Sequence, residues 1–383
     1  MDYIPYGTQD IQPEDIEAVV RVLKSDWLTQ GPTIAEFEGA LASVSDCRHA
    51  VAVNSGTSAL HIACAALGLG PGDWLWTSPN TFAASANCAL YCGANVDFVD
   101  IDPQTYNMSV GRLAAKLEQA ATTGRLPKIV VTVHFGGQSC DMAGIRALAE
   151  KYRFFVVEDA SHAVGARYKN EPVGNCRYSD ISVFSFHPVK IITTAEGGAA
   201  LTNNADLAER MARLRTHGIT RDSAAMEGET EGPWYYQMLE LGLNYRMTDL
   251  QAALGLSQLS RLERYVTRRR ELASRYDTLL AELPVTRPWQ SSETSSSWHL
   301  YVVQVNADAR RRIFERMRAA GIGVNVHYIP VHLQPFYKRL GFGEGDFPEA
   351  ERYYARALTL PLFPRLTELQ QDRVVEALRS SLN

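Results

Sequence analysis

The sequence lacks several features that would place it in a specialised class of protein. It has six cysteines in 383 residues and no Cys-x-x-Cys pair, so neither a disulfide framework nor a metal or redox motif is indicated. No uncharged apolar run reaches the roughly 20 residues that a transmembrane helix needs. The first ten residues, MDYIPYGTQD, are neither basic nor apolar, unlike a signal peptide. We therefore expect a soluble, cytoplasmic protein without a metal site and without a membrane partner.

An excess of positive charge is also missing. The chain has 38 Lys and Arg against 43 Asp and Glu, for a net charge of −5. This balance gives no reason to expect a nucleic-acid partner. The hydrophobic share of 46% and the charged share of 21% are those of an ordinary globular protein. A chain of 383 residues is long enough for two domains with a substantial core.

Short apolar runs alternate with helical patterns over the first half of the chain. The runs AVAVN, VDFVDI, IVVTV, FFVVED, ISVFSF and AALT begin at residues 50, 96, 129, 154, 181 and 199. Strands that are apolar on both faces and separated by helices indicate a largely parallel sheet that is covered on both sides. Near the start, Ile16, Val19, Val20 and Leu23 recur at helical spacing after Pro13, which predicts an amphipathic helix.

The pattern changes near residue 250. A long helical stretch, LQAALGLSQLSRLERYVTRRRELASRY, leads into a region that mixes helices with strands such as WHLYVVQV, and SSETSSS at 291–297 predicts a polar loop. We predict an α/β fold with two domains. The large domain, 1–250, has an N-terminal helical segment and a mixed, mostly parallel sheet covered by helices. The smaller α+β domain, 251–383, is entered by the long helix.

Polar residues stand where ligands of such sheets bind, at the carboxyl ends of strands. His134 follows IVVTV, Asp159 ends FFVVED, and Ser185 and Lys190 come with ISVFSF. A desolvated lysine amine has a lowered pKa and can form a Schiff base. A carboxylate at the end of a buried strand needs a partner, which could be a protonated ring nitrogen or a local cap or salt bridge.

The segment Ser55-Gly56-Thr57-Ser58 follows AVAVN and opens a predicted helix. Hydroxyls and a glycine at a helix N-terminus suit a phosphate group, although serine and threonine are also common as simple caps. A phosphate anchor, a carboxylate for a ring nitrogen and a Schiff-base lysine are together what a protein supplies to pyridoxal phosphate. Their succession along one sheet favours that cofactor.

Longer motifs are similar to those of the DegT/DnrJ/EryC1/StrS sugar aminotransferases, which are fold-type I pyridoxal-phosphate enzymes. They are NSGTSALHIA, PNTFAASANCALYCGANVDFVDIDPQTYN, VVEDASHAVGA, FSFHPVKIITTAEGG, LGLNYRMTDLQAALGLSQL and VHYIPVH, and they follow the family order through nearly the whole chain. The resemblance implies a transaminase with pyridoxal 5'-phosphate, or its pyridoxamine form, as cofactor. Relatives that dehydrate sugars carry histidine at the position of Lys190, so the lysine favours transamination.

The resemblance assigns roles to individual residues. Lys190 would carry the cofactor, Asp159 would hold its ring nitrogen, and both would be catalytic. Phe82 would stack on the ring, and His162 would lie beside the ring hydroxyl, where many relatives have glutamine. Asn244 would reach the phosphate of a neighbouring subunit, which implies a homodimer with shared active sites. The full predicted cofactor-binding set is Gly56, Thr57, Phe82, Asp159, His162, Ser185, Lys190 and Asn244.

Within the family, the chain resembles the branch that makes UDP-4-amino-4,6-dideoxy-N-acetyl-β-L-altrosamine for pseudaminic acid synthesis. This resemblance rests on SDWLTQGP, PWYYQMLELGLNYRMTD and VNVHYIPVHLQPFYKRLGF. It implies transfer of an amino group from L-glutamate to C4 of a UDP-4-keto-6-deoxy-N-acetylhexosamine. The predicted substrate-binding residues are Trp27, Leu28, Thr29, Arg221, Arg246, His327, Tyr328 and His332. For the arginines, the histidines and Tyr328 the alternative is a solvated charge or an ordinary packed aromatic, and for Trp27, Leu28 and Thr29 it is a simple turn at the end of a helix.

Other functions fit parts of the pattern. An aminotransferase for another nucleotide 4-ketohexose, of the UDP-bacillosamine or GDP-perosamine type, would use the same motifs. A cysteine desulfurase of this fold would need an exposed reactive cysteine, for which Cys140 and Cys176 are the loop candidates. A regulator that senses its ligand without turnover would be expected to add a basic DNA-binding domain, which the sequence does not indicate.

Overall fold

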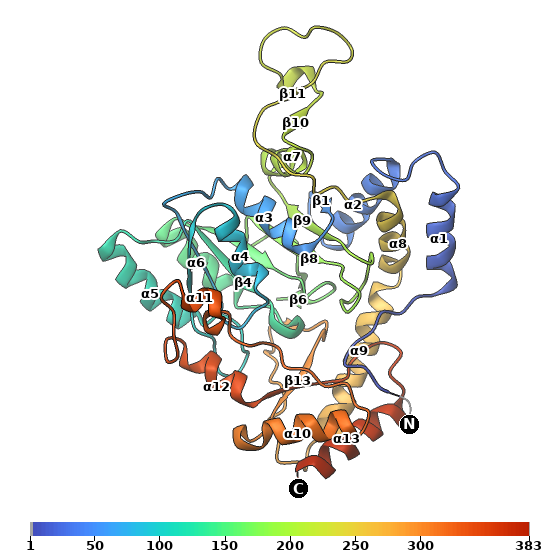
Figure 1. Ribbon diagram of the computed structural model, residues 1–383, viewed down its shortest axis with the longest axis vertical. Coiled ribbons are helices and arrows are strands. Elements are labelled where there is room, and N and C mark those ends of the chain that lie inside the picture. Colours follow the sequence, from blue (N-terminus) through green and yellow to red (C-terminus); the bar gives the residue numbers. More distant parts are fainter. Residues whose placement is uncertain (1–2, 383) are drawn as a thin grey trace.

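The computed structural model describes residues 3–382. Its centre is a seven-stranded sheet in the order β1-β9-β8-β5-β4-β2-β3 (Figure 1). The strands are β1 (His49–Val53), β9 (Gly198–Thr202), β8 (Ile181–Ser185), β5 (Phe155–Asp159), β4 (Ile129–Val133), β2 (Trp74–Thr77) and β3 (Asn95–Phe98). The five strands from β8 to β3 run parallel, and β9 is antiparallel to β8 and β1. The predicted mixed, mostly parallel sheet is confirmed, and β2 is a strand that the sequence patterns missed.

Helices cover both faces of this sheet. The helices α3 (Gly56–Ala66), α4 (Ala84–Tyr91) and α7 (Ala205–Leu214) lie on one face, and α2 (Pro32–Val44), α5 (Val110–Thr123), α6 (Met142–Tyr152) and α8 (Asp249–Leu259) lie on the other. Successive strand residues point to opposite faces: Val131 and Val157 join the first core, whereas Val130 and Val156 join the second. Burial on both sides explains why these strands are apolar throughout.

The helix α1 (Pro13–Leu23) begins at the predicted proline, but its apolar stripe faces outward. Ile16 and Leu23 are 59% and 56% exposed, whereas Asp15 is buried. The Asp15 carboxylate accepts a hydrogen bond from Arg261 Nη2 at 2.5 Å. Burial alone would raise the pKa of Asp15, but this guanidinium and the other hydrogen bonds to the carboxylate hold it below its ordinary value. A polar anchor on the neighbouring helices therefore decides which face of α1 is inside.

The predicted long helix is two helices, because α8 ends at Leu259 and α9 (Leu262–Leu279) begins after a break. The remaining elements are β13 (Tyr301–Gln304), α10 (Ala307–Ala319), η3 (Val331–Leu333), α11 (Pro335–Lys338), α12 (Pro348–Arg356), β14 (Ala357–Leu360) and α13 (Glu368–Leu382). The strands β13 and β14 pair antiparallel. Their core also includes Ile4, whose backbone pairs with Gly321 and Gly323. The start of the chain thus packs with the C-terminal region, while the boundary near residue 250 stays a prediction.

Short elements complete the chain. A three-stranded sheet joins β6 (Arg167–Tyr168), β7 (Glu171–Pro172) and β12 (Thr294–Ser295), so part of the predicted SSETSSS loop is a strand. The turn η1 (Phe135–Gly137) follows β4. Residues 217–245, which we call the arm, contain β10 (Ile219–Thr220), η2 (Ser223–Ala225) and β11 (Gln237–Met238) and project from the body at the top of Figure 1. The arm exposes large apolar side chains, among them Trp234 and Leu241.

Candidate active site

A pocket of about 490 Å³ lies at the carboxyl ends of β5 and β8 and is completed by residues from the C-terminal region. Its lining contains every predicted cofactor-binding residue except Asn244, and it contains His327 and Tyr328 of the predicted substrate set. The lining residues are Tyr6, Ser55, Gly56, Thr57, Leu60, Thr81, Phe82, Ala84, Val133, Asp159, Ser161, His162, Ser185, His187, Val189, Lys190, Glu196, His299, Asn325, Val326, His327 and Tyr328.

The register of the sheet builds a cradle for a phosphate group. Gly198 at the start of β9 pairs with both Val53 and Ser185, so the ends of β1 and β8 flank the start of β9. The chain then turns into α3, whose N-cap Ser55 accepts a backbone N–H at 3.1 Å. A Cβ on Gly56 would lie only 2.9 Å from Ser185 Cβ. The glycine therefore lets the Ser185 hydroxyl approach the positive end of the helix, where an anion binds well.

The carboxylate of Asp159 is buried and oriented by neighbouring hydroxyl and backbone groups. Ser85 Oγ donates to Oδ2 at 2.6 Å, and the Ser161 N–H donates to Oδ1 at 3.2 Å. Thr81 Oγ1 lies 2.7 Å from Ser85 Oγ. Each carboxylate oxygen keeps a lone pair for a further donor such as a protonated ring nitrogen. The sequence patterns missed Ser85 and Thr81 as supports, although both stand beside Phe82 in the motif that was used for ring stacking.

Lys190 lies in the loop after β8, where its backbone N–H donates to the His187 carbonyl at 2.8 Å. Within residues 3–382, no hydrogen bond or ion pair engages its Nζ atom. Burial lowers the pKa of Lys190 to about 8, against the opposing charge of Asp159. Near physiological pH about a tenth to a fifth of the amine is therefore neutral and available as a nucleophile or base.

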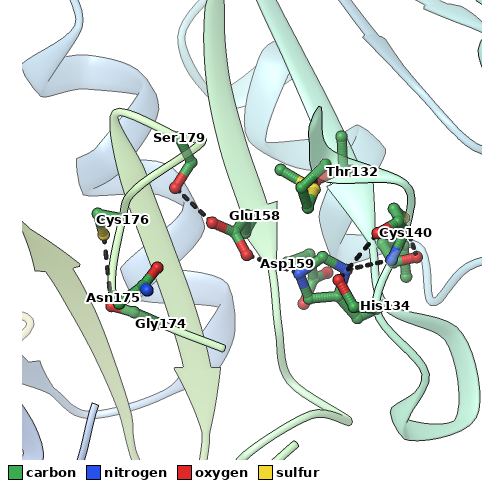
Figure 2. Close-up of polar contacts among 12 residues, drawn as sticks. Thr132, His134, Cys140, Glu158, Asp159, Gly174, Asn175, Cys176 and Ser179 are labelled. Atoms are coloured by element: carbon green, nitrogen blue, oxygen red, sulfur yellow. Dashed lines mark hydrogen bonds and ion pairs between the residues drawn. The ribbon is translucent and has the colours of Figure 1, made fainter. Parts of the chain in front are cut away.

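Figure 2 shows a buried polar chain centred on Glu158, the residue before Asp159 in β5. Successive residues of a strand point to opposite faces, so Glu158 points away from the face of Asp159. His134 Nε2 lies 2.7 Å from a Glu158 oxygen, and the Ser179 hydroxyl donates to the other oxygen. The Cys140 N–H also donates to His134 Nδ1 at 3.1 Å. His134, the third polar strand-end residue of the sequence pattern, thus links β4 to β5 and does not line the pocket.

The C-terminal wall of the pocket consists of neutral aromatic and amide groups. His327 Nδ1 lies 2.8 Å from Thr359 Oγ1, and burial lowers the pKa of His327 to about 3. Burial also places the pKa of His299 well below its ordinary value. The sequence patterns did not indicate Tyr6, His299 or Asn325. These residues reach the pocket from separate elements, and no local spacing connects them.

Several predicted residues lie away from this pocket. Asn244 is exposed and forms a backbone bridge with Thr216 at the base of the arm. Arg246 lines a separate cavity of about 200 Å³ beside α2, and the Arg221 guanidinium lies 5.9 Å from the Tyr236 ring within the arm. Trp27, Leu28 and Thr29 are exposed.

His332 has a different environment from the other predicted substrate residues. Its side chain is fully buried, and Nε2 pairs with Glu351 at 2.9 Å. This contact joins η3 to α12, outside the pocket lining. Cys140 and Cys176 are 1% and 7% exposed and lie outside the lining as well. Neither cysteine is placed to act as a desulfurase nucleophile in this pocket.

The pocket fits pyridoxal phosphate on three independent points. These are the cradle that a Cβ at Gly56 would fill, the Asp159 carboxylate with its spare acceptor capacity, and the unpaired Lys190 amine. Phe82, 63% exposed at the pocket, offers an aromatic face to a ring. This set of groups on a mixed α/β sheet defines a fold-type I pyridoxal-phosphate enzyme.

The chain belongs to the DegT/DnrJ/EryC1/StrS aminotransferase family, which it matches over residues 9–379. It is a pyridoxal-phosphate-dependent sugar aminotransferase. Among curated relatives, it is 42% identical to the spore coat polysaccharide biosynthesis protein SpsC of Bacillus subtilis, over 98% of this chain and 96% of that protein. It is 40% identical to the UDP-4-amino-4,6-dideoxy-N-acetyl-β-L-altrosamine transaminase of Campylobacter jejuni, over 94% and 92% of the two chains.

Solved structures resemble it closely over their full length. The pyridoxamine-phosphate form of the putative sugar aminotransferase Spr1654 from Streptococcus pneumoniae has a TM-score of 0.91 at 32% identity, covering 99% of both chains. Helicobacter pylori PseC, an aminotransferase of pseudaminic acid biosynthesis, has a TM-score of 0.91 at 30% identity, covering 100% of this chain and 99% of PseC. In the described part of the chain, no helix is both long and apolar enough to cross a membrane.

Proposed function

We propose that this enzyme transfers the amino group of L-glutamate to C4 of a UDP-4-keto-6-deoxy-N-acetylhexosamine. The product would be UDP-4-amino-4,6-dideoxy-N-acetyl-β-L-altrosamine, for pseudaminic acid synthesis in the cytoplasm. The observation that carries the proposal is the 40% identity to the Campylobacter transaminase of that name over nearly the whole chain. The 42% identity to SpsC, a spore coat polysaccharide biosynthesis protein, supports the alternative that the substrate is a different sugar. From the sequence, that alternative is a nucleotide 4-ketohexose of the UDP-bacillosamine or GDP-perosamine type.

Four groups of the pocket would hold the cofactor. Gly56 and Thr57 would offer backbone N–H groups to its phosphate, and the Ser185 hydroxyl would add a side-chain donor. Asp159 would keep its ring nitrogen protonated, with Ser85 fixing the carboxylate at 2.6 Å. When bound, pyridoxal phosphate supplies an electron sink for the carbon that loses a proton.

Lys190 would move the proton in both halves of the reaction. Its neutral amine, available because burial lowers its pKa to about 8, takes a proton from the α-carbon of the amino donor. The same Nζ atom later delivers a proton to C4 of the sugar from its own side of the pocket, which sets the configuration of the new amine. Positioned proton transfer of this kind contributes roughly a hundred- to ten-thousandfold in rate.

The sugar would lie against the C-terminal wall. Tyr328 and His327 face the pocket that contains Lys190, so a sugar whose C4 is next to the amine would contact them. Both imidazoles of this wall, His299 and His327, have strongly lowered pKa values. The wall therefore offers hydrogen bonds without adding positive charge beside Lys190.

Three of the remaining predicted residues, Asn244, Arg221 and Arg246, would act across a homodimer. Asn244 and Arg246 lie outside the pocket of their own chain, at the C-terminal end of the arm, which projects away from the body (Figure 1). An exposed apolar arm indicates a protein contact. A second copy that received it would place Asn244 near the partner's phosphate cradle, with Arg221 and Arg246 available for the nucleotide diphosphate.

The substrate proposal is tested by offering the enzyme, with pyridoxal phosphate and L-glutamate, two UDP-4-keto-6-deoxy-N-acetyl sugars in separate reactions. One is the L-altro precursor and the other belongs to the D-gluco series. Mass spectrometry detects replacement of the ketone oxygen by an amine. Amination of the L-series sugar alone is the expected result. Amination of the D-series sugar alone would favour the bacillosamine type, and amination of neither would exclude both sugars as substrates.

Shared sites are tested by subunit complementation. In the proposed dimer, each site uses Lys190 of one chain and Asn244 of the other. Dimers that carry Lys190→Ala in both chains, or Asn244→Ala in both chains, therefore lack one of these residues in every site and should be inactive or weak. A mixed dimer would then rebuild one intact site, and we expect it to regain up to about half of the parent activity. Mixed dimers that regain no activity would argue against a contribution of Asn244 to the partner's site.

A further inference from the structure

The hydrogen bonds of His162 fix which of its ring nitrogens carries the proton. The ring is buried, and the Gly136 N–H donates to Nδ1 at 3.3 Å, while Nε2 lies 3.0 Å from Tyr328 Oη. A backbone N–H can only donate, so Nδ1 must present a lone pair to it. The proton of the ring is therefore on Nε2, and Nε2–H donates to the Tyr328 oxygen.

This arrangement leaves the hydroxyl hydrogen of Tyr328 without a protein acceptor. In the described part of the chain, His162 Nε2 is the one group paired with Tyr328 Oη, and that pairing uses an oxygen lone pair. Tyr328 lines the pocket together with Lys190 and Asp159. The hydroxyl hydrogen is thus available to a ligand atom inside the pocket.

Packing and burial maintain this state. The His299 ring lies 4.4 Å from the His162 ring between centroids, and Phe135 lies 6.2 Å away on an edge. Burial keeps the pKa of His162 well below its ordinary value, and the charge of Lys190 lowers it further. Burial also raises the pKa of Tyr328, as does the charge of Asp159. The imidazole and the phenol are therefore both neutral at physiological pH.

The polar groups of the cofactor identify the ligand atom. The phosphate, the ring nitrogen and the aldehyde carbon have partners in the cradle, in Asp159 and in Lys190. The ring hydroxyl oxygen is the one polar group left, and it is next to the carbon that bears the aldehyde. His162 follows Asp159 by three residues, and the Tyr328 ring lies 6.3 Å between centroids from Phe82, the residue that would stack on the cofactor ring. All four residues line the same pocket, which puts the pair within the part of the pocket that the ring would occupy.

We propose that Tyr328 is a catalytic residue that donates a hydrogen bond to the ring oxygen of the cofactor, and that His162 is a positioning residue that orients this hydroxyl. The two residues act as one directed donor: the Gly136 N–H sets the His162 tautomer, and the tautomer sets the direction of the Tyr328 hydroxyl. A donor at the ring oxygen stabilises negative charge there. It thereby favours the deprotonated form of the bound cofactor at lower pH.

The test measures the pKa of the visible absorbance change of the cofactor-loaded enzyme, without any sugar or amino donor. Tyr328→Phe keeps the ring but removes the hydroxyl, and we expect it to raise that pKa by about one unit, a tenfold change. His162→Gln can accept the Gly136 N–H through its carbonyl and donate to Tyr328 through its amide. We expect it to stay much closer to the parent than His162→Leu, which offers neither bond.

Tyr337→Phe is the matched control. Its hydroxyl donates to Asn87 Oδ1 at 2.6 Å, and neither residue lines the pocket, so its loss should leave the absorbance pKa at the parent value. The other titratable groups that face this part of the pocket, Asp159, His299 and His327, are unchanged in all variants, as is Lys190, to which the cofactor would be attached. Far-ultraviolet circular dichroism checks that each variant is folded.

Two results would overturn the proposal. An unchanged absorbance pKa in folded Tyr328→Phe enzyme would show that Tyr328 does not donate a hydrogen bond to the ring oxygen. Equal pKa values for His162→Leu and the parent would remove the orienting role of His162. Because no sugar is present, neither result depends on which nucleotide sugar the enzyme aminates.

Discussion

One wall of the pocket carries charged groups, whereas the other carries neutral ones. The wall at the strand ends carries the charged groups, Lys190 and Asp159, and the helix terminus that opens at Gly56. The C-terminal wall carries His299, His327 and Tyr328, all of them neutral because burial shifts their pKa values away from the charged form. The difference indicates a division of labour. One wall holds and activates a charged cofactor, and the other orients ligands without placing a second cation beside the catalytic amine.

The largest expected effect comes from removing the amine of the charged wall. Lys190→Ala deletes both the attachment point of the cofactor and the group that moves protons. We expect loss of turnover by at least about a thousandfold and loss of the absorbance of the covalently bound cofactor. Lys151→Ala, on the exposed face of α6, is the control. A Lys190→Ala enzyme with normal turnover would contradict the assignment of the strand-end wall.

The phosphate cradle should be the next most sensitive part of this wall. In Gly56→Ala, the new Cβ would lie 2.9 Å from Ser185 Cβ, so the helix terminus or the Ser185 hydroxyl must move. We expect the dissociation constant of the cofactor to rise about tenfold or more, which corresponds to about 1.4 kcal/mol. Gly39→Ala is the matched control, because a Cβ at Gly39 in α2 would meet no atom within 4 Å. Equal dissociation constants of the cofactor for Gly56→Ala and Gly39→Ala, measured by equilibrium dialysis, would contradict a phosphate site at Gly56 and Ser185.

The lowered pKa of Lys190 gives a pH test of the same wall. Apoprotein should react with free pyridoxal phosphate through the neutral amine, whose fraction falls about tenfold per unit of pH below the pKa of about 8. We therefore expect a rate that rises up to about pH 8 and then levels off, followed by stopped-flow absorbance. A rate still rising tenfold per unit near pH 10 would mean that the pocket does not desolvate this amine.

The C-terminal wall, whose groups are neutral, should show a smaller effect, which is a loss of folding stability at acidic pH. His327 has a pKa of about 3 in the folded protein, below its ordinary value of 6.5. The unfolded chain thus binds a proton that the folded chain excludes, so stability is lost as pH falls from 6.5 towards 3. Between pH 6.5 and 5 this is at most about 2 kcal/mol.

Urea unfolding of apoprotein at pH 7 and pH 5 measures this loss, and His327→Gln should reduce the difference between the two pH values. His187→Gln, at the exposed His187, is the matched control, because it makes the same chemical change outside the neutral wall. If His327→Gln and the parent lost the same stability between pH 7 and pH 5, His327 would not be the group that folding keeps neutral.

The strand-end wall was largely predictable from sequence because its chemistry follows local rules. Strands buried on both faces read as apolar runs, and parallel strands bring their carboxyl ends to one edge, so Asp159 and Lys190 could be placed together. The C-terminal wall was less predictable. Tyr6, His299 and Asn325 reach the pocket from three distant segments, and no spacing in the sequence links them. His134 shows the limit of the strand-end rule, because side chains at such an end can point to either face.

The sequence by itself determined the alternation of strands and helices, the start of α1 at Pro13, and the order of the motifs that carry the cofactor chemistry. These features depend on the local hydrophobic periodicity and on residues such as proline, which fits only a few backbone conformations. Tertiary structure alone decided that the apolar stripe of α1 faces outward, that Ile4 joins the C-terminal core, and that a Gly136 N–H sets the tautomer of His162. Those outcomes depend on which distant groups meet in three dimensions, because a buried polar group takes the partner that packing brings to it.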